Sequence, residues 1–142
     1  MRFMLLLKGE PPADAQPSEE LLGGMLAYQE DLAKAGVLLA SEGLHPSSMG
    51  SRVVYRSGKR TVVDGPFTET KELIAGFILI DVRSKEEAIE WAKRCPVDLA
   101  VQGDMEAVIE VRQVAETEEL DAMADEQRAA DQRLRSRQPE GS

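Results

Sequence analysis

The sequence predicts one α+β domain made of two strand–helix–strand (βαβ) units with a β-hairpin inserted between them. Apolar runs of strand length alternate with two segments in which apolar residues recur at helical spacing. The dipeptide Ser57-Gly58 separates two β-branched segments at the distance expected of a hairpin turn. A chain of 142 residues has room for one hydrophobic core and an appendage, but not for two cores.

The first βαβ unit begins with a strand over residues 2–7. Its apolar side chains are consecutive, which predicts burial on both faces and a position in the middle of the sheet. Ser18 offers an N-cap for a helix whose leucines and Met25 recur at helical spacing, and Gly36 fits the position that follows a helix C-terminus. Residues 37–40 follow directly as the second strand.

The hairpin and the second βαβ unit come next. Residues 52–56 and 59–63 are the charged, β-branched strands of the hairpin. A buried strand over residues 76–82 precedes a helix that begins with a capping box at Ser84. Apolar and polar side chains then alternate over residues 105–114, which predicts the last strand.

With the hairpin set aside, the order βαβ–βαβ is the split pattern of a ferredoxin-like sandwich. Two helices cover only one face of a four-stranded sheet, so the apolar residues on the other face need a partner. A second copy of the chain is the simplest such partner, and we therefore expect a homodimer.

The segment after Thr117 is rich in Ala, Glu, Asp, Gln and Arg, and we expect it to form a terminal helix. Its narrow stripe, at an approximate three-four spacing, consists of Leu120, Met123, Gln127, Ala130 and Leu134. Two interpretations are open: the helix docks on a dimer partner, or it is largely solvated and frays toward its end. The expected organisation is a domain over residues 1–115 and a helical extension with a disordered tail over residues 116–142.

Composition argues against several classes of partner. A formal net charge of −9, with only one Trp, two Tyr and three Phe, argues against nucleic-acid binding, which needs a basic surface. No run of about 18 apolar residues is present, so we expect a soluble protein without a membrane partner. The single cysteine, Cys95, cannot form an internal disulfide, which favours a cytoplasmic location.

The residue types also give little support to metal or cofactor chemistry. One histidine and one cysteine cannot furnish a closed zinc site, although a weak carboxylate site for magnesium stays open. Cys95 precedes Pro96 at a helix end, where the helix dipole opposes a thiolate, so burial in the core is the favoured interpretation. We expect no cofactor.

Two polar segments at strand ends are the candidates for a site. Asp64 stands beside the Gly65-Pro66 turn, where it either accepts hydrogen bonds from turn amides or faces a pocket. His45 is the only histidine, and histidine is the side chain that ordinarily titrates near neutral pH, as a general acid or base must. The alternative is an exposed loop histidine. If the two strand ends converge, His45 and Asp64 form a carboxylate-oriented imidazole.

The longest recognisable motif is Asp64-Gly65-Pro66-Phe67 with Glu69-Thr70-Lys71-Glu72 and Gly76, preceded by Ala35-Gly36-Val37 and Glu42-Gly43-Leu44-His45-Pro46. In these residues the chain closely resembles the DGPF branch of the YCII-related protein family, over residues 1–115. The resemblance implies a dimeric α/β-barrel of ferredoxin-like subunits. The helix after Thr117 looks like an extension outside the usual domain of that family.

The resemblance implies two different kinds of function. Relatives on the YCII side look like enzymes with a His-Asp pair whose histidine lies on the first helix, but the corresponding segment here, Ser18 to Ala35, contains no histidine. Only Asp64 and its neighbours are therefore carried over, as motif residues. Family members also resemble partner proteins encoded beside, or fused to, alternative sigma factors, which implies a regulatory role.

Two functional hypotheses follow. The first is a small-molecule-binding protein or enzyme with a polar pocket in the dimer, in which His45 and Asp64 are the catalytic candidates and Glu42, Lys71 and Glu72 are the ligand-binding ones. The second is a non-catalytic regulatory module that presents its acidic surface or its terminal helix to a protein partner such as a transcription factor.

Overall fold

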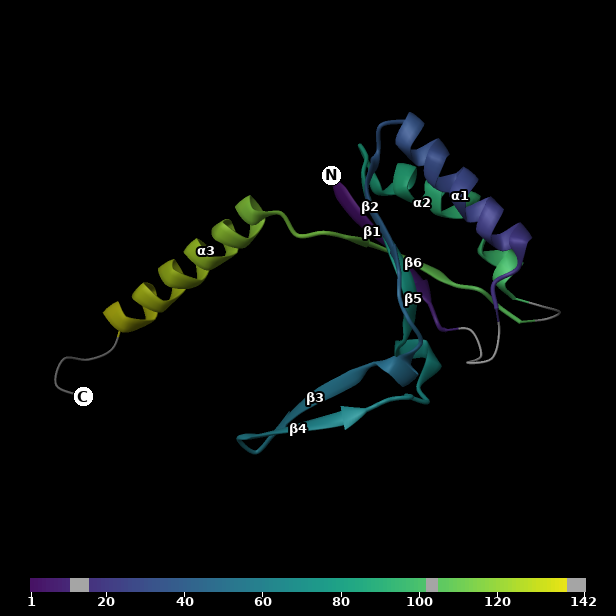
Figure 1. Ribbon diagram of the computed structural model, residues 1–142. Helices are drawn as coiled ribbons and strands as arrows, with labels where there is room; N and C mark the ends of the chain where they lie inside the picture. Colours follow the sequence, from purple (N-terminus) through teal and green to yellow (C-terminus); the bar gives the residue numbers. More distant parts are fainter. Residues whose placement is uncertain (11–15, 102–104, 138–142) are drawn as a thin grey trace.

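The computed structural model describes residues 1–10, 16–101 and 105–137 (Figure 1). The strands are β1 (Arg2–Lys8), β2 (Leu38–Gly43), β3 (Ser51–Arg56), β4 (Lys59–Asp64), β5 (Ile74–Asp81) and β6 (Ile109–Gln113). The helices are α1 (Glu19–Lys34), α2 (Lys85–Arg94) and α3 (Thr117–Ser136), with 3-10 turns η1 (Ser47–Met49), η2 (Thr70–Glu72) and η3 (Val97–Ala100). The disordered tail predicted for the end of the chain lies, from residue 138 onward, outside the described residues.

Four strands form one antiparallel sheet in the order β2-β5-β1-β6, and β3 and β4 form a separate two-stranded sheet. This order, with two helices on one face, is the ferredoxin-like arrangement, so the predicted α+β fold is confirmed. β1 lies between β5 and β6, as its apolar run predicts. In Figure 1, α1 and α2 lie on one side of the sheet, whereas the hairpin and α3 extend on the other side.

Both N-caps predicted for the domain's helices are present. The Ser18 hydroxyl accepts a hydrogen bond from the Leu21 N–H at 3.0 Å, and the Ser84 hydroxyl accepts one from the Glu87 N–H at 3.1 Å. The Glu87 carboxylate accepts the N–H of Arg83, one residue before the cap, at 2.9 Å. Gly36 follows α1 with a φ of +74°, the left-handed conformation that glycine adopts without a steric penalty.

The core lies between the sheet and the two helices. Phe3 and Leu5 of β1 and Ile78 and Ile80 of β5 are at most 1 % exposed, and Leu32 of α1 is fully buried against them. Side chains alternate between the faces of a strand, so these residues define the closed face of the sheet, which α1 and α2 cover.

The buried stripe of α1 differs from the expected one at two positions. Leu22 and Leu26 belong to the apolar repeat in the sequence, but both are more than half exposed, and Tyr28 is buried in their place. The buried stripe runs through Leu21, Met25, Tyr28 and Leu32. Leu22 and Leu26 each follow a residue of this stripe, and one residue along a helix is a rotation of about 100°. The Tyr28 hydroxyl donates to the Trp91 carbonyl oxygen at 2.6 Å, and burial raises the pKa of that hydroxyl.

Cys95 is buried at the end of α2, as predicted. Its Sγ lies 3.8 Å from the Met25 Sδ, and burial raises the pKa of the thiol to about 11. The thiol is therefore protonated at neutral pH and contributes packing rather than reactivity.

The last strand is shorter than the alternation over residues 105–114 predicts. β6 pairs with β1 from Leu7↔Ile109 to Phe3↔Gln113, and one further backbone hydrogen bond joins Lys8 to Val108. Because β1 ends at Lys8, the residues just before Val108 have no strand to pair with. Sequence alternation alone contains no information about where the neighbouring strand stops.

The hairpin turns at Ser57 and Gly58, whose φ values of +50° and +77° are those of a type I′ turn. Among its apolar residues, Tyr55 and Val62 are more than 60 % exposed. An isolated two-stranded hairpin is at best marginally stable in water.

α3 begins at Thr117, where the change of composition places the start of a terminal helix, and none of its described side chains is buried. The Arg2 guanidinium donates to both Glu116 carboxylate oxygens at 3.1 and 3.0 Å, which ties the start of the helix to β1. This hydrogen bonding lowers the pKa of Glu116. Within the described residues, no helix has the length and apolar character needed to cross a membrane.

Candidate functional site

The face of the sheet opposite α1 and α2 carries four half-buried apolar side chains at its centre: Met4, Leu6, Phe77 and Leu79. We call these four residues the open-face patch. They alternate along β1 and β5 with the buried residues of the closed face. Neighbouring pairs Leu6↔Phe77 and Met4↔Leu79 stand side by side in the register of the two strands.

Charged residues border the open-face patch on both outer strands. On β2, Glu42 lies opposite Phe77, and on β6, Glu110 and Arg112 lie opposite Leu6 and Met4. Glu110 and Arg112 form an ion pair with each other. The open face therefore has an apolar centre and a charged margin.

At the end of the sheet where β2 stops, the Gly65-Pro66 turn closes the base of the hairpin. The Gly65 N–H donates to the Gly50 carbonyl oxygen at 2.9 Å, and a Cβ at position 65 would collide with the carbonyl group of Ser47. The glycine of the motif is therefore required by a close backbone approach, which is a structural role.

Ser47 joins this turn to the end of β1. Its N–H and its hydroxyl donate to the two carboxylate oxygens of Glu10 at 2.8 and 2.9 Å, and its hydroxyl accepts the Phe67 N–H at 3.1 Å. Three segments far apart in the sequence are thereby held together by one short side chain.

Arg52 of β3 fixes the segment that follows the turn. Its guanidinium lies 3.8 Å from the centre of the Phe67 ring, and it forms ion pairs with Glu69 at 3.7 Å and Glu72 at 3.8 Å. Each pair is partly exposed and individually weak, but together they hold η2 against the hairpin base.

The predicted site residues all lie at this end of the sheet. Asp64 ends β4 and its carboxylate accepts the Ser51 hydroxyl at 2.6 Å, rather than amides of the turn. His45 is exposed in the loop that leaves β2, and no hydrogen bond joins it to Asp64. Lys71 and Glu72 are exposed on η2. The structure brings these segments together but does not form the carboxylate-oriented imidazole.

The backbone of Glu42 lies close to the backbone of Gly76, near the start of β5. A Cβ at position 76 would come within 2.6 Å of the Glu42 carbonyl oxygen, so Gly76 permits β2 and β5 to approach here. The Glu42 side chain, on the face shared with Phe77, is the one predicted ligand-binding group that borders the open-face patch.

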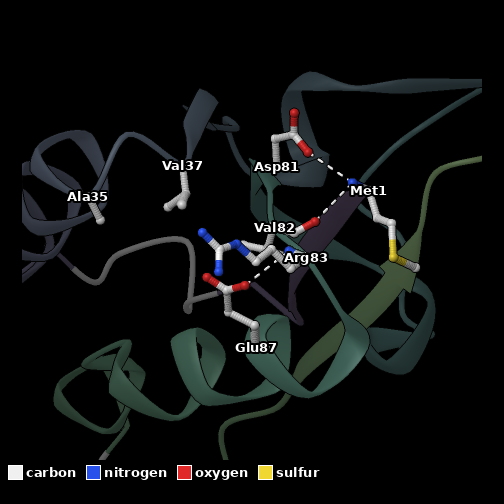
Figure 2. A pocket seen from close by; sticks show the side chains of 7 residues that line it. All are labelled: Met1, Ala35, Val37, Asp81, Val82, Arg83 and Glu87. Atoms are coloured by element: carbon white, nitrogen blue, oxygen red, sulfur yellow. Dashed lines mark hydrogen bonds and ion pairs between the residues drawn. The ribbon is translucent and has the colours of Figure 1, made fainter.

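Two hollows on the described part of the chain lie away from the predicted site residues. One, of about 610 Å³, is at the opposite end of the sheet, and Figure 2 shows its lining residues. Its polar groups already bind each other, because the Met1 ammonium donates to Asp81 at 3.0 Å and to the Val82 carbonyl oxygen at 2.8 Å. A second, of about 710 Å³, lies between α2 and β6. Neither is lined by a predicted site residue.

Among the residues that the structure describes, no group of three or more His, Cys, Asp or Glu side chains is arranged to hold a metal ion. The carboxylates near the hairpin base are instead engaged with Ser47, Ser51 and Arg52.

Sequence reasoning missed the parts played by Glu10, Ser47 and Arg52. No local pattern indicates them, because each acts across a gap of more than ten residues. The open-face patch did have a signal, namely apolar residues at consecutive positions of two central strands. That pattern predicts an apolar second face without saying what covers it.

The fold and the site define an α+β domain with one closed and one open sheet face and a motif turn at the base of its hairpin. The profile of the YCII-related domain matches residues 1–118, and the chain belongs to that family. An uncharacterised protein of Rhizobium meliloti (strain 1021) is 33 % identical over 100 residues, which are 70 % of this chain and 77 % of that protein.

A solved structure with a similar chain course is the 5-chloro-2-hydroxyhydroquinone dehydrochlorinase of Burkholderia phenoliruptrix AC1100, in complex with 2,5-dihydroxybenzoquinone. The similarity has a TM-score of 0.48 at 17 % identity, and it covers 83 % of this chain and 97 % of that one. A similarity of this extent carries no argument about activity.

Proposed function

We propose that two copies of this chain pack their open sheet faces together and enclose a pocket that binds a small organic molecule. The observation that carries the proposal is the open-face patch, which lies on the side of the sheet opposite α1 and α2 and is only half-buried within the described residues. An apolar floor with few polar groups at its margin is the usual composition of a small-molecule site. The expected ligand has an apolar body and polar groups at its edge.

The predicted site residues receive roles in this pocket. Glu42 borders the apolar floor, and His45, Lys71 and Glu72 lie at the same end of the sheet. Asp64 is oriented by Ser51. In the enzymatic form of the proposal, His45 transfers a proton and Asp64 assists it; in the binding form, these groups only recognise the ligand.

The dimer is tested first by placing a charge in the open-face patch of a chain that ends at residue 116, in which α3 cannot hold two copies together. Leu6→Glu would bury a carboxylate in the interface, so we expect sedimentation velocity to show a dimer for this shortened chain and a monomer for its Leu6→Glu variant. Leu26→Glu is the matched control, because Leu26 is exposed on α1 behind the sheet and its variant should stay dimeric. A shortened chain that is monomeric at micromolar concentration would overturn the proposal.

The ligand is tested by native mass spectrometry of protein purified from its own organism. We expect a dimer with a reproducible additional mass, identified after denaturation, and we expect the Leu6→Glu monomer to lack it. His45→Ala then tests whether His45 belongs to the pocket: reduced retention of that molecule assigns it there, and unchanged retention removes it from the site.

A second candidate is a regulatory module that binds a protein partner. The supporting observations are the net charge of −9 and the exposed apolar side chains of α3. Affinity capture from a lysate of the source organism would compare the full chain with a chain that ends at residue 116. A partner captured equally by both forms would exclude α3 as the docking element.

A further inference from the structure

We propose that α3 pairs with α3 of a second copy of the chain as an antiparallel two-helix coiled coil. The starting observation is that this helix of 20 residues is unsupported in its own chain. Leu120, Met123 and Leu134 are each more than half exposed, and no side chain of α3 is buried. In proteins, most of the stability of a helix comes from tertiary packing of its apolar face.

The spacing of the stripe fits a two-helix partner. Leu120, Met123, Gln127, Ala130 and Leu134 follow a three-four repeat without interruption, which places them on the single seam of a coiled coil. The seam is too narrow for a helix that lies on a sheet, which needs a wider apolar face. A polar residue within the seam, here Gln127, commonly sets the register of such a pair.

The charges of α3 select a second copy of itself in antiparallel orientation. In its first half every charged residue is acidic, namely Glu118, Glu119, Asp121, Asp125 and Glu126. Its second half carries Arg128, Arg133 and Arg135 against the single acid Asp131. An antiparallel pair places the acidic half of each helix beside the basic half of the other, whereas a parallel pair places like charges together.

The helix dipole does not account for this polarity. Its effect is confined to the first and last turns, which covers Glu118, Glu119, Arg133 and Arg135. Asp121, Glu126 and Arg128 lie further inside the helix. One interior pair is satisfied within the helix, since Arg128 binds Asp125 at 3.0 Å, but Glu126 and Arg133 border the seam, where a second helix would meet them.

Antiparallel pairing makes a geometric prediction that other arrangements do not share. Glu126 and Arg133 meet across the seam when Gln127 of one chain packs beside Ala130 of the second. In this register two copies of residue 127 are about 4.5 Å apart along the helix axis, and residue 120 is equally close to residue 134 of the second chain. Two copies of residue 120 are then about 25 Å apart along the helix axis, from a rise of about 1.5 Å per residue.

The test uses single cysteines in the full chain and a short bismaleimide cross-linker. We expect cross-linked dimers from Gln127→Cys, none from Leu120→Cys or Leu134→Cys alone, and cross-linked dimers again when those two variants are mixed. The wild-type chain is the control, because the buried Cys95 has a raised pKa and should not react. A cross-link from Leu120→Cys alone would indicate a parallel pair, and no cross-link from any variant would indicate an unpaired helix; either result overturns the proposal.

Charge reversal provides an independent test in the Gln127→Cys chain. In a symmetric pair, Glu126→Arg alone places two new arginines beside Arg133 of the opposite chain, and Arg133→Glu alone places two new glutamates beside Glu126. We expect each of these like-charge variants to lower the yield of cross-link by about tenfold. Mixing the two reversed chains should restore the yield. Glu118→Arg, on the side away from the seam, is the matched control, and an equal loss in that variant would overturn the proposal.

The proposal does not rest on the pocket between the open faces. The cysteine variants of α3 leave the sheet unchanged, and the Leu6→Glu test is made in a chain without α3, so a failure of one proposal is distinguishable from a failure of the other.

Discussion

The two faces of the sheet are made from alternate residues of the same strands, yet they have different surroundings. Leu5 is fully buried under the helices on the closed face, whereas its neighbour Leu6 is half-buried in the open-face patch. The closed face is complete within one chain. The open face, the hairpin and α3 all expose apolar side chains on the other side of the molecule (Figure 1). The buried core of the single chain therefore lies on one side of the sheet, and most of the apolar side chains that we propose to associate lie on the other.

The largest expected effect separates the two faces directly. Leu5→Ala leaves a cavity in the closed core, so we expect urea denaturation to show a loss of about 3 kcal/mol that does not change with protein concentration. Leu6→Ala removes the same atoms from the open face, so its effect should be smaller for the monomer and should depend on protein concentration. If Leu5→Ala and Leu6→Ala lowered the free energy of unfolding equally, at every protein concentration, the two faces would not differ in this way.

The next effect concerns the hairpin base, where the Gly65-Pro66 turn packs closely against Ser47. Gly65→Ala forces the turn away from the Ser47 carbonyl group, and we expect a loss of about 1–3 kcal/mol. Gly23→Ala is the matched control, because a Cβ there meets open space within α1 and should stabilise the helix by about 0.5–1 kcal/mol. A neutral Gly65→Ala would contradict the close approach.

A smaller effect is expected at Ser47, which joins β1 to the motif turn. Ser47→Ala removes the hydroxyl's bonds to Glu10 and Phe67, so we expect a loss of about 1 kcal/mol in thermal or chemical unfolding. Faster hydrogen exchange at Phe67 should accompany it. Ser48→Ala, at the neighbouring exposed position, is the control and should leave that exchange rate unchanged.

The smallest effect is a pH dependence at the start of α3. Because Arg2 lowers the pKa of Glu116, the ion pair stabilises the fold above the ordinary glutamate pKa of about 4.3, and this contribution is lost as the pH falls through the lowered value. NMR titration of Glu116 should show this lowered pKa, which Arg2→Gln should return toward the ordinary value. Arg83→Gln, an exposed arginine beside α2, should leave it unchanged.

Local features of the fold could be predicted from the sequence because local interactions produce them. Ser18 and Ser84 cap helices through hydrogen bonds to residues three positions away, and Ser57-Gly58 forms the hairpin turn by its own backbone preferences. The length of β6 was wrong for the converse reason, since the strand ends where β1, more than a hundred residues earlier, stops pairing with it.

The candidate site also has features that the sequence predicted and features that it did not. Asp64 and Gly65 are recognisable as a motif turn, but their partners Ser51 and Ser47 come from other segments and carry no sequence signal. His45 and Asp64 both lie at strand ends, as expected, but no hydrogen bond joins them, because side-chain direction depends on the complete packing. The catalytic roles of these residues stay predictions.

The sequence by itself determined the order of the elements, their caps and turns, and the apolar character of both faces of β1 and β5. Those properties depend on backbone preferences and on side-chain periodicity within a few residues. Only the tertiary structure decided which face α1 and α2 cover, where Ser47 meets Glu10, and in which direction the hairpin and α3 leave the sheet. These choices depend on contacts between residues far apart in the chain, whose free energies are set by the geometry of the whole fold.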